Sequence, residues 1–199
     1  ISGKSVQDVI DGDKAPELCE ILRIGAQAAS GLAAAHAQGL IHRDIKPANL
    51  LLENGVERVK ITDFGLARAV DDATRTRSGV VAGTPQYMSP EQARGEAVSQ
   101  QADVWALAVV AFEMLTGREP FAGANVPDTF QRICSGTAPR ASAMARNLPH
   151  ALDAVFARAF ARKLEDRFTD VFALAAAIEA AYLGAPNLPA SPAAPQLLP

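Results

Sequence analysis

The chain reads HRDIKPAN at residues 42–49 and DFG at residues 63–65. Together the two stretches supply a carboxylate, a lysine and two further side chains whose oxygen atoms could bind a metal. Carboxylate and amide oxygens are hard ligands that suit Mg²⁺. We therefore predict that the two stretches form neighbouring loops of a single site.

The residue types in these loops favour the transfer of a phosphoryl group to a hydroxyl. In that reaction charge spreads over the transferring oxygens, so cations must neutralise it and a carboxylate must steer the attacking hydroxyl. Asp44 could steer the hydroxyl. Lys46 is a cation, and Asn49 and Asp63 could hold a metal cation. We expect ATP and Mg²⁺ at this site, with Mn²⁺ as a second candidate metal.

The composition excludes several other classes of protein. A hydrophobic content of 49% and a charged content of 21% over 199 residues are those of an ordinary globular domain. The formal charge of −3 argues against a nucleic-acid partner held by a strong basic field. The longest apolar run, residues 104–112, is far shorter than the roughly 20 residues that span a bilayer.

The cysteines and the first residue bear on where the protein works. Cys19 and Cys134 have no metal-ligand spacing, which favours a reduced compartment and leaves a single disulfide open. No signal peptide is visible, so we expect a cytoplasmic location. The sequence begins at Ile1, and we interpret it as part of a longer protein that a membrane segment beyond its tail could tether.

Hydrophobic periodicity predicts a mainly helical fold with one small hairpin. The predicted elements are an amphipathic piece at 6–10, helices at 17–38, 99–117, 149–161 and 170–183, and strands at 49–53 and 57–62. The helix at 99–117, which Ser99 could cap, is apolar on nearly all sides, so we expect it at the centre of the fold. Residues 71–81 are predicted to form a mobile loop, and residues 184–199 a Pro/Ala-rich linker or disordered tail.

Five short motifs occur in a fixed order along the chain. They are HRDIKPAN (42–49), DFG (63–65), GTPQYMSPE (83–91), DVW (103–105) and EDRF (165–168). In this order and spacing, residues 1–183 resemble the C-terminal lobe of a bacterial, eukaryotic-like protein Ser/Thr kinase. The resemblance implies a mainly α, kinase-like lobe: a helical bundle around a central buried helix, with a β-hairpin at the catalytic cleft. It also implies transfer of the γ-phosphate of ATP to Ser/Thr hydroxyls of protein substrates.

The resemblance assigns roles to the loop residues. It implies that Asp44 orients the acceptor hydroxyl and receives its proton, and that Lys46 reaches the γ-phosphate. Asn49 and Asp63 would hold the metal. Thr84 would hydrogen-bond Asp44 and Lys46 and shape the groove for Ser/Thr acceptors, although it could also be an ordinary turn residue before a proline.

A second group of residues is implied around the nucleotide and in the loop before residue 83. Leu51 resembles the floor under the adenine, with Val6 beside it and Ser5 near the ribose; ordinary strand core is the alternative for Leu51. Thr76 and Ser78 match positions that are phosphorylated in the family it resembles, and Thr74 in the same loop is a further candidate. The chain could therefore associate with itself during autophosphorylation. Arg43 either pairs with such a phosphate or is a solvated surface charge.

Further residues are implied to have structural roles. Glu91 and Arg167 would form a buried ion pair. Asp103 would accept backbone N–H bonds from the His-Arg-Asp turn, because a carboxylate buried in an apolar helix is costly unless it is satisfied. His42 is expected to pack near Phe64 and not to act as a base.

The sequence lacks three parts that the resemblance calls for. It contains no Gly-rich phosphate loop, no strand with a Val-Ala-Ile-Lys lysine and no helix glutamate to pair with that lysine. We therefore expect a partner, the N-terminal kinase lobe, and little activity without it. A non-catalytic docking or scaffold module and a small-molecule phosphotransferase remain as alternatives.

Overall fold

The computed structural model describes residues 3–12, 16–53, 58–64, 85–145 and 147–184. The long helices of this part are α2 (Leu18–His36), α5 (Gln101–Thr116), α6 (Val126–Ser135), α8 (Ala151–Ala159) and α9 (Val171–Leu183). The shorter elements are α1 (Val6–Ile10), α4 (Pro90–Ala93), α7 (Ala141–Met144) and the 3₁₀ turns η1 (Pro47–Asn49), η2 (Pro85–Tyr87) and η3 (Leu164–Asp166). The strands are β1 (Lys4–Ser5), β2 (Leu50–Glu53) and β3 (Arg58–Ile61). The mainly helical fold with a small sheet confirms the predicted class.

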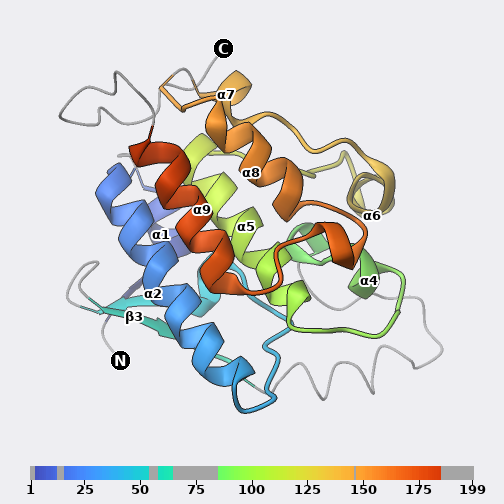
Figure 1. Ribbon diagram of the computed structural model, residues 1–199, viewed down its shortest axis with the longest axis horizontal. Helices are drawn as coiled ribbons and strands as arrows, with labels where there is room; N and C mark the ends of the chain where they lie inside the picture. Colours follow the sequence, from blue (N-terminus) through green and yellow to red (C-terminus); the bar gives the residue numbers. More distant parts are fainter. Residues whose placement is uncertain (1–2, 13–15, 54–57, 65–84, 146, 185–199) are drawn as a thin grey trace.

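Helix α5 lies at the centre of the bundle (Figure 1). Every residue from Ala102 to Thr116 is buried, because the helix is apolar on nearly all sides and packs against α2, α8 and α9. Aromatic rings pack beside the start of α5: Trp105 stacks on Phe121 with ring centroids 5.2 Å apart. Gly117 ends α5 in the left-handed conformation, with φ 68°.

The sheet is antiparallel with strand order β1-β2-β3. The expected hairpin is present, because β2 pairs with β3 in a register that sets Leu51 opposite Lys60. Leu50 and Leu52 face the core, whereas Leu51 is only half-buried on the other face. Strand β1 was not predicted, since two residues are too few to show a strand pattern.

The helix predictions are confirmed for α2, α5, α8 and α9, with small differences at the ends, and the amphipathic piece predicted at 6–10 is helix α1. Ser99, the expected cap, lies one residue before the N-cap Gln100 and accepts the N–H of Gln101 at 3.3 Å. Helix α6 was missed. It is ten residues long, has Pro127 in its first turn and buries only Thr129 and Ile133, so few apolar positions indicate a helix there.

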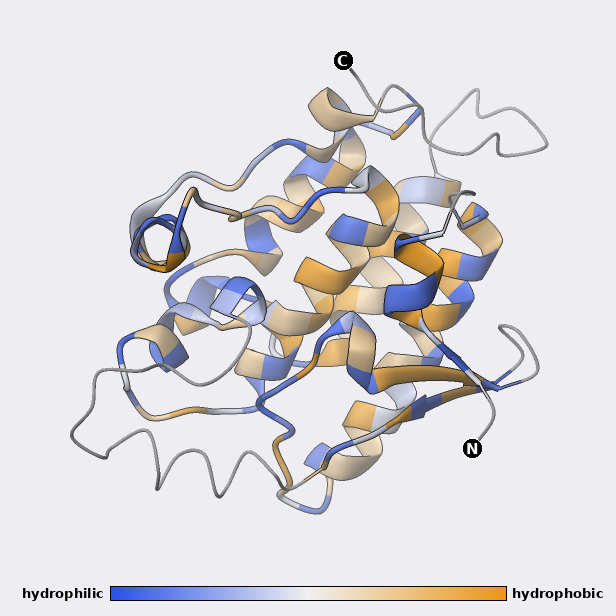
Figure 2. Cartoon of the chain, turned by 180° about the vertical axis from the view of Figure 1, so that it is seen from behind, coloured by the Kyte–Doolittle hydropathy of each residue, from blue (hydrophilic) through white to orange (hydrophobic). Residues whose placement is uncertain are grey.

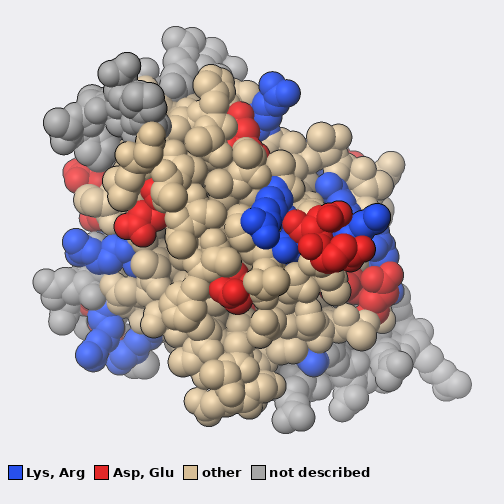
Figure 3. All heavy atoms as spheres, viewed as in Figure 1, with Lys and Arg blue, Asp and Glu red and all other residues tan. Residues whose placement is uncertain are grey.

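The surface agrees with the charge analysis. From the back of the molecule, hydrophobic residues lie mainly on the helix faces that meet in the interior (Figure 2). On the face shown in Figure 3, the described Lys and Arg side chains lie beside Asp and Glu side chains and form no continuous basic surface. None of the described helices combines the length and the apolar character that crossing a bilayer requires.

Candidate active site

The HRDIKPAN loop runs from the end of α2 to η1 and β2. Two of its side chains, Lys46 and Asn49, contact the carboxylate of a third, Asp44. Lys46 Nζ lies 2.8 Å from Asp44 Oδ2. Asn49 Nδ2 donates to the Asp44 carbonyl at 2.8 Å and to its Oδ2 at 3.2 Å. The Asp44 side chain is 43% exposed, so an acceptor group can reach it from solvent.

A second carboxylate, Asp103 in the first turn of α5, holds the loop through hydrogen bonds to its backbone. Asp103 is fully buried and accepts the N–H groups of His42 at 2.9 Å and Arg43 at 2.8 Å. These bonds confirm the expected role of Asp103. Its third partner is His36 Nε2 at 2.7 Å, a contact that sequence reasoning missed because the two residues are 67 positions apart.

Two residues of the site have a strained backbone. Arg43 has φ 66° and Asp63 has φ 63°, in the left-handed region that non-glycine residues rarely adopt. Both peptide groups around Arg43 are held: its N–H by Asp103, and its carbonyl by Gln92 Nε2 at 2.8 Å. The bonds on either side stabilise a turn that would otherwise relax.

His42 joins the HRDIKPAN loop to the end of β3. Its Nε2 lies 2.8 Å from the Thr62 carbonyl, and its Nδ1 lies 3.3 Å from the N–H of Asp44. This pattern assigns the ring proton to Nε2, which donates, while Nδ1 accepts. The ring meets Phe64 edge-on, with centroids 4.5 Å apart, which confirms the expected packing.

Asn49 and Asp63 are brought together by the hairpin. The N–H of Thr62 donates to the Asn49 carbonyl at 3.0 Å, and Asp63 is the next residue. Because the amide nitrogen of Asn49 faces Asp44, the amide oxygen faces away from it. Within the described ranges, no group of three His, Cys, Asp or Glu is poised for a metal. One carboxylate and one amide oxygen do fit Mg²⁺, which usually takes few protein ligands and fills its shell with phosphate oxygens and water.

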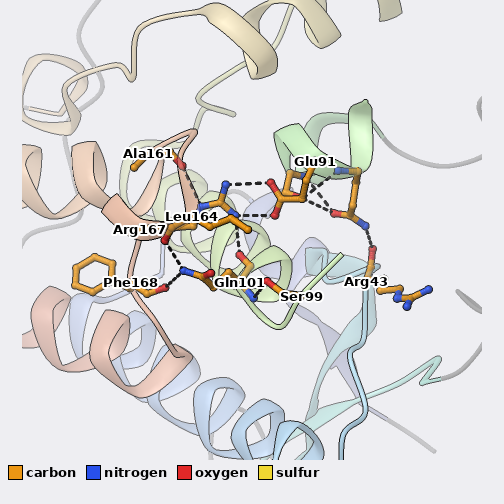
Figure 4. A network of polar contacts seen from close by, with 10 residues as sticks. Arg43, Glu91, Ser99, Gln101, Ala161, Leu164, Arg167 and Phe168 are labelled. Atoms are coloured by element: carbon orange, nitrogen blue, oxygen red, sulfur yellow. Dashed lines mark hydrogen bonds and ion pairs between the residues drawn. The ribbon is translucent and has the colours of Figure 1, made fainter. Parts of the chain in front are cut away.

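A buried ion pair ties the segment after residue 85 to the helical core (Figure 4). Arg167 donates to the two carboxylate oxygens of Glu91 at 2.8 and 3.0 Å, and also to the carbonyls of Ala161 and Gln101. Burial alone would raise the pKa of Glu91, but the hydrogen bonds and charge of Arg167 outweigh it and leave that pKa below its usual value. The expected pair is confirmed.

Comparison with known proteins identifies this arrangement. Residues 1–182 match the family model described as the protein kinase domain. The chain belongs to the protein kinase family.

Several relatives within this kinase family are bacterial proteins. The chain is 42% identical over 173 residues to the probable serine/threonine-protein kinase PknB of Bifidobacterium longum, covering 84% of this chain and 24% of the relative. It is 43% identical over 150 residues to the serine/threonine-protein kinase PknL of Mycobacterium tuberculosis, covering 75% and 37%. It is 36% identical over 202 residues to the serine/threonine-protein kinase PknB of Mycobacterium leprae, covering 100% and 31%. The chain thus spans between 24% and 37% of the length of these kinases.

The three residues expected around the nucleotide, Ser5, Val6 and Leu51, lie in different surroundings. Ser5 and Leu51 are directly opposite in the β1–β2 register, so they share the outer face of the sheet. The Ser5 hydroxyl, however, is engaged with Asp8 in the capping box of α1. Val6 departs from the expectation: it is fully buried, because the first turn of α1 packs onto η1 and β2, so its side chain does not face a ligand.

Another buried pair in this kinase-family chain was not anticipated. The Tyr87 hydroxyl donates to Glu113 Oε2 at 2.7 Å, and both residues are buried. Burial raises the pKa of Tyr87, and the negative charge of Glu113 raises it further. Burial also raises the pKa of Glu113, and the Tyr87 bond only partly offsets this. The only sequence signal for the Tyr87–Glu113 pair was a glutamate within the apolar run of α5.

Several predicted residues lie outside the described residues. They are Thr84, the candidate phosphorylation sites Thr74, Thr76 and Ser78, and the turn of the predicted hairpin between its strands at 49–53 and 57–62. The predicted roles of these residues, the mobile loop at 71–81 and the division at residue 183 stay predictions.

Proposed function

We propose that the protein to which this chain belongs is an ATP-dependent protein Ser/Thr kinase. The observation that carries the proposal is the convergence of Lys46 and Asn49 on the exposed carboxylate of Asp44. A carboxylate that is accessible, held in place and next to a cation is the group that phosphoryl transfer to a hydroxyl requires.

The proposed reaction assigns a task to each of these side chains. Asp44 accepts a hydrogen bond from the Ser/Thr hydroxyl, whose oxygen forms a bond to the γ-phosphorus. The bond between that phosphorus and the β,γ-bridging oxygen breaks, ADP leaves, and the hydroxyl proton passes to Asp44. Lys46 supplies positive charge beside the γ-phosphate, and Asn49 and Asp63 would hold Mg²⁺. When bound, the metal neutralises charge on the phosphates.

Four features favour a protein acceptor over a small molecule. Lys46 stands two residues after Asp44, which is the Ser/Thr-kinase pattern, and residues 83–91 resemble a substrate-binding segment. The ion pair of Glu91 with Arg167 holds the end of that segment rigidly. The three bacterial relatives described above are all named serine/threonine-protein kinases.

We further propose that the chain corresponds to the C-terminal lobe and works with an N-terminal kinase lobe. The Gly-rich loop, the strand lysine and the helix glutamate are not found in its sequence. Phe64 is 41% exposed although it packs on His42, and an exposed aromatic at the site fits a surface that another lobe covers. ATP as donor favours a cytoplasmic location, and Thr74, Thr76 and Ser78 are the candidate sites of autophosphorylation between copies.

Phosphoamino-acid analysis of the full-length parent tests the proposal. The parent is incubated with γ-labelled ATP, Mg²⁺ and a protein acceptor, beside the Asp44→Asn variant. We expect label on phosphoserine and phosphothreonine, with transfer by the variant lower by about 10²–10⁴-fold. Label confined to a small-molecule acceptor, or a folded wild-type parent that transfers nothing, would refute a protein kinase activity.

A further inference from the structure

The side chain of Gln92, in the short helix α4, makes hydrogen bonds in two directions. Its Oε1 accepts the N–H and the hydroxyl of Ser89, both at 3.1 Å. Its Nε2 donates to the carbonyl of Arg43 at 2.8 Å, although the two residues are 49 positions apart. Gln92 therefore caps its own helix and also reaches the loop that carries Asp44.

The bonds to Ser89 and to Arg43 together fix the orientation of the Gln92 amide. Because Oε1 must face the two donors of Ser89, the NH₂ group at the other end of the planar amide must face Arg43. Arg43 is the residue with φ 66°, and its N–H is held by Asp103 from α5. The strained turn is thus held at its N–H from α5 and at its carbonyl from α4.

The carbonyl that Gln92 holds belongs to the peptide group shared with Asp44. A rotation of this peptide group would move the Asp44 carboxylate, which contacts the acceptor hydroxyl in the proposed reaction. Helix α4 is itself held by the neighbouring residue, Glu91, through its bonds to Arg167. Figure 4 shows both sets of bonds: Arg167 is bonded to Glu91, and α4 is also bonded to the Arg43 carbonyl, so the backbone of α4 connects the two.

We propose that Gln92 is a positioning residue for phosphoryl transfer, which fixes the Arg43–Asp44 peptide group and thereby the direction of the Asp44 carboxylate. This inference rests on the proposed kinase function. Asp44 touches the acceptor hydroxyl, whereas Lys46, Asn49 and Asp63 face the nucleotide and the metal. Loss of the Gln92 bond should therefore lower kcat and leave the KM for ATP unchanged.

Gln92→Glu separates this role from helix capping. Glutamate is a preferred partner of serine in a capping box, so the variant keeps the cap of α4. Its second carboxylate oxygen takes the place of the NH₂ group and faces the Arg43 carbonyl, which repels it. Gln100→Glu is the matched control, because Gln100 Nε2 also donates to a distant carbonyl, that of Thr169 at 3.0 Å, away from the catalytic loop.

The experiment compares the full-length parent with its Gln92→Glu and Gln100→Glu variants in steady-state kinetics and amide hydrogen exchange. For Gln92→Glu we expect a kcat about tenfold lower, a KM for ATP within about twofold of wild type, and faster exchange at residues 42–44. For Gln100→Glu we expect wild-type values of all three quantities.

Two results would overturn the proposal: wild-type kcat and exchange in Gln92→Glu, or the same losses in Gln100→Glu. An inactive wild-type parent would instead refute the proposed kinase function, and the exchange data would still decide whether Gln92 anchors the turn. Faster exchange at residues 42–44 in Gln92→Glu would support the anchor, and unchanged exchange would refute it.

Discussion

Two carboxylates that hydrogen-bond within or to the HRDIKPAN loop have opposite surroundings. Asp44 is 43% exposed and contacts Lys46, whereas Asp103 is fully buried and accepts three hydrogen bonds. A buried carboxylate with three donors stabilises structure, because losing it would leave those donors unsatisfied. An exposed carboxylate beside a cation is available for chemistry. The residue type is the same, and the surroundings decide the role.

At the same scale, the proposed nucleotide site separates binding from transfer. Asp63→Ala should abolish Mg²⁺-dependent ATP binding, because it removes the only carboxylate of the proposed metal pair. Asp44→Asn should keep binding and lose transfer, because Asp44 faces the acceptor. Calorimetric titration of both variants of the full-length parent with ATP and Mg²⁺ measures the first property, and a transfer assay measures the second.

The control for this pair is titration without Mg²⁺, in which wild type and Asp63→Ala should bind ATP equally weakly. Wild-type affinity in Asp63→Ala would remove Asp63 from the metal site. Wild-type transfer in a folded Asp44→Asn protein would remove Asp44 from the reaction.

Glu113 gives a prediction for stability as a function of pH. Its pKa is raised in the folded protein, so its contribution to stability is complete below its usual value of 4.5 and is lost as the pH rises through the folded pKa. Glu113→Gln stays neutral and can still accept the Tyr87 hydrogen bond. The melting temperatures of variant and wild type should agree below pH 4.5, and the variant should be more stable at neutral pH. A less stable variant at pH 7 would mean that the carboxylate charge stabilises the pair.

At the scale of elements, Arg167 is the junction of three segments. It follows η3 directly, and its guanidinium contacts Glu91 of α4, the Gln101 carbonyl at the start of α5 and the Ala161 carbonyl after α8. Its guanidinium carbon also lies 5.1 Å from the ring centroid of Trp105. One buried cation therefore sets the relative positions of α4, α5 and the segment after α8.

Removing the anionic partner should be costly. Glu91→Gln leaves Arg167 buried without a counter-charge, and we expect a loss of about 3–5 kcal/mol in the free energy of unfolding. The pKa of Glu91 is lowered in the folded protein, so its contribution is complete above pH 4.5 and is lost as the pH falls through the folded pKa. Denaturant unfolding at pH 7 and at acidic pH measures both effects.

The double variant Glu91→Leu with Arg167→Met provides the control. It removes both charges and should recover only part of the loss, because the carbonyls of Ala161 and Gln101 would lose their donor. A Glu91→Gln protein as stable as wild type would show that the pair contributes little.

Elements with a wide apolar face were predictable from sequence, and contacts between distant residues were not. The period of α2 and the nearly continuous apolar run of α5 are long local patterns, whereas α6 is only ten residues long and buries just two of them. Within the site, the motif residues were predictable because they are close in sequence. The bonds of His36 to Asp103, Tyr87 to Glu113 and Gln92 to Arg43 join positions 26 to 67 residues apart, and only the folded backbone brings them together.

At the scale of the whole molecule, the site lies at the boundary between the helical bundle and the sheet. The HRDIKPAN loop leaves α2, passes over the start of α5 and enters β2, and Asp63 follows β3. Leu51 and Ser5 face outward on the same side of this sheet. The chain thus presents the residues proposed to be catalytic on the side that the proposed N-terminal lobe would cover.

This arrangement predicts weak nucleotide binding by the 199-residue chain alone. A half-covered site remains hydrated, and water weakens each electrostatic contact. In calorimetric titration with Mg²⁺ and ATP, we expect no binding in the micromolar range for the chain, and micromolar binding for a protein that includes the N-terminal lobe. Micromolar binding by the chain alone, lost in Asp63→Ala, would show that this lobe forms the nucleotide site by itself.

The contrast between Asp44 and Asp103 also bears on how such a protein can evolve. Substituting the exposed Asp44 would remove the proposed chemistry and leave the buried hydrogen bonds of Asp103 intact. A descendant gene could therefore lose catalysis in one mutational step and keep every surface on which partners assemble. Substituting Asp103 would instead leave its buried donors unsatisfied and destabilise the fold. Selection on the fold alone would thus preserve Asp103 for as long as the gene is expressed, and only selection on catalysis would preserve Asp44.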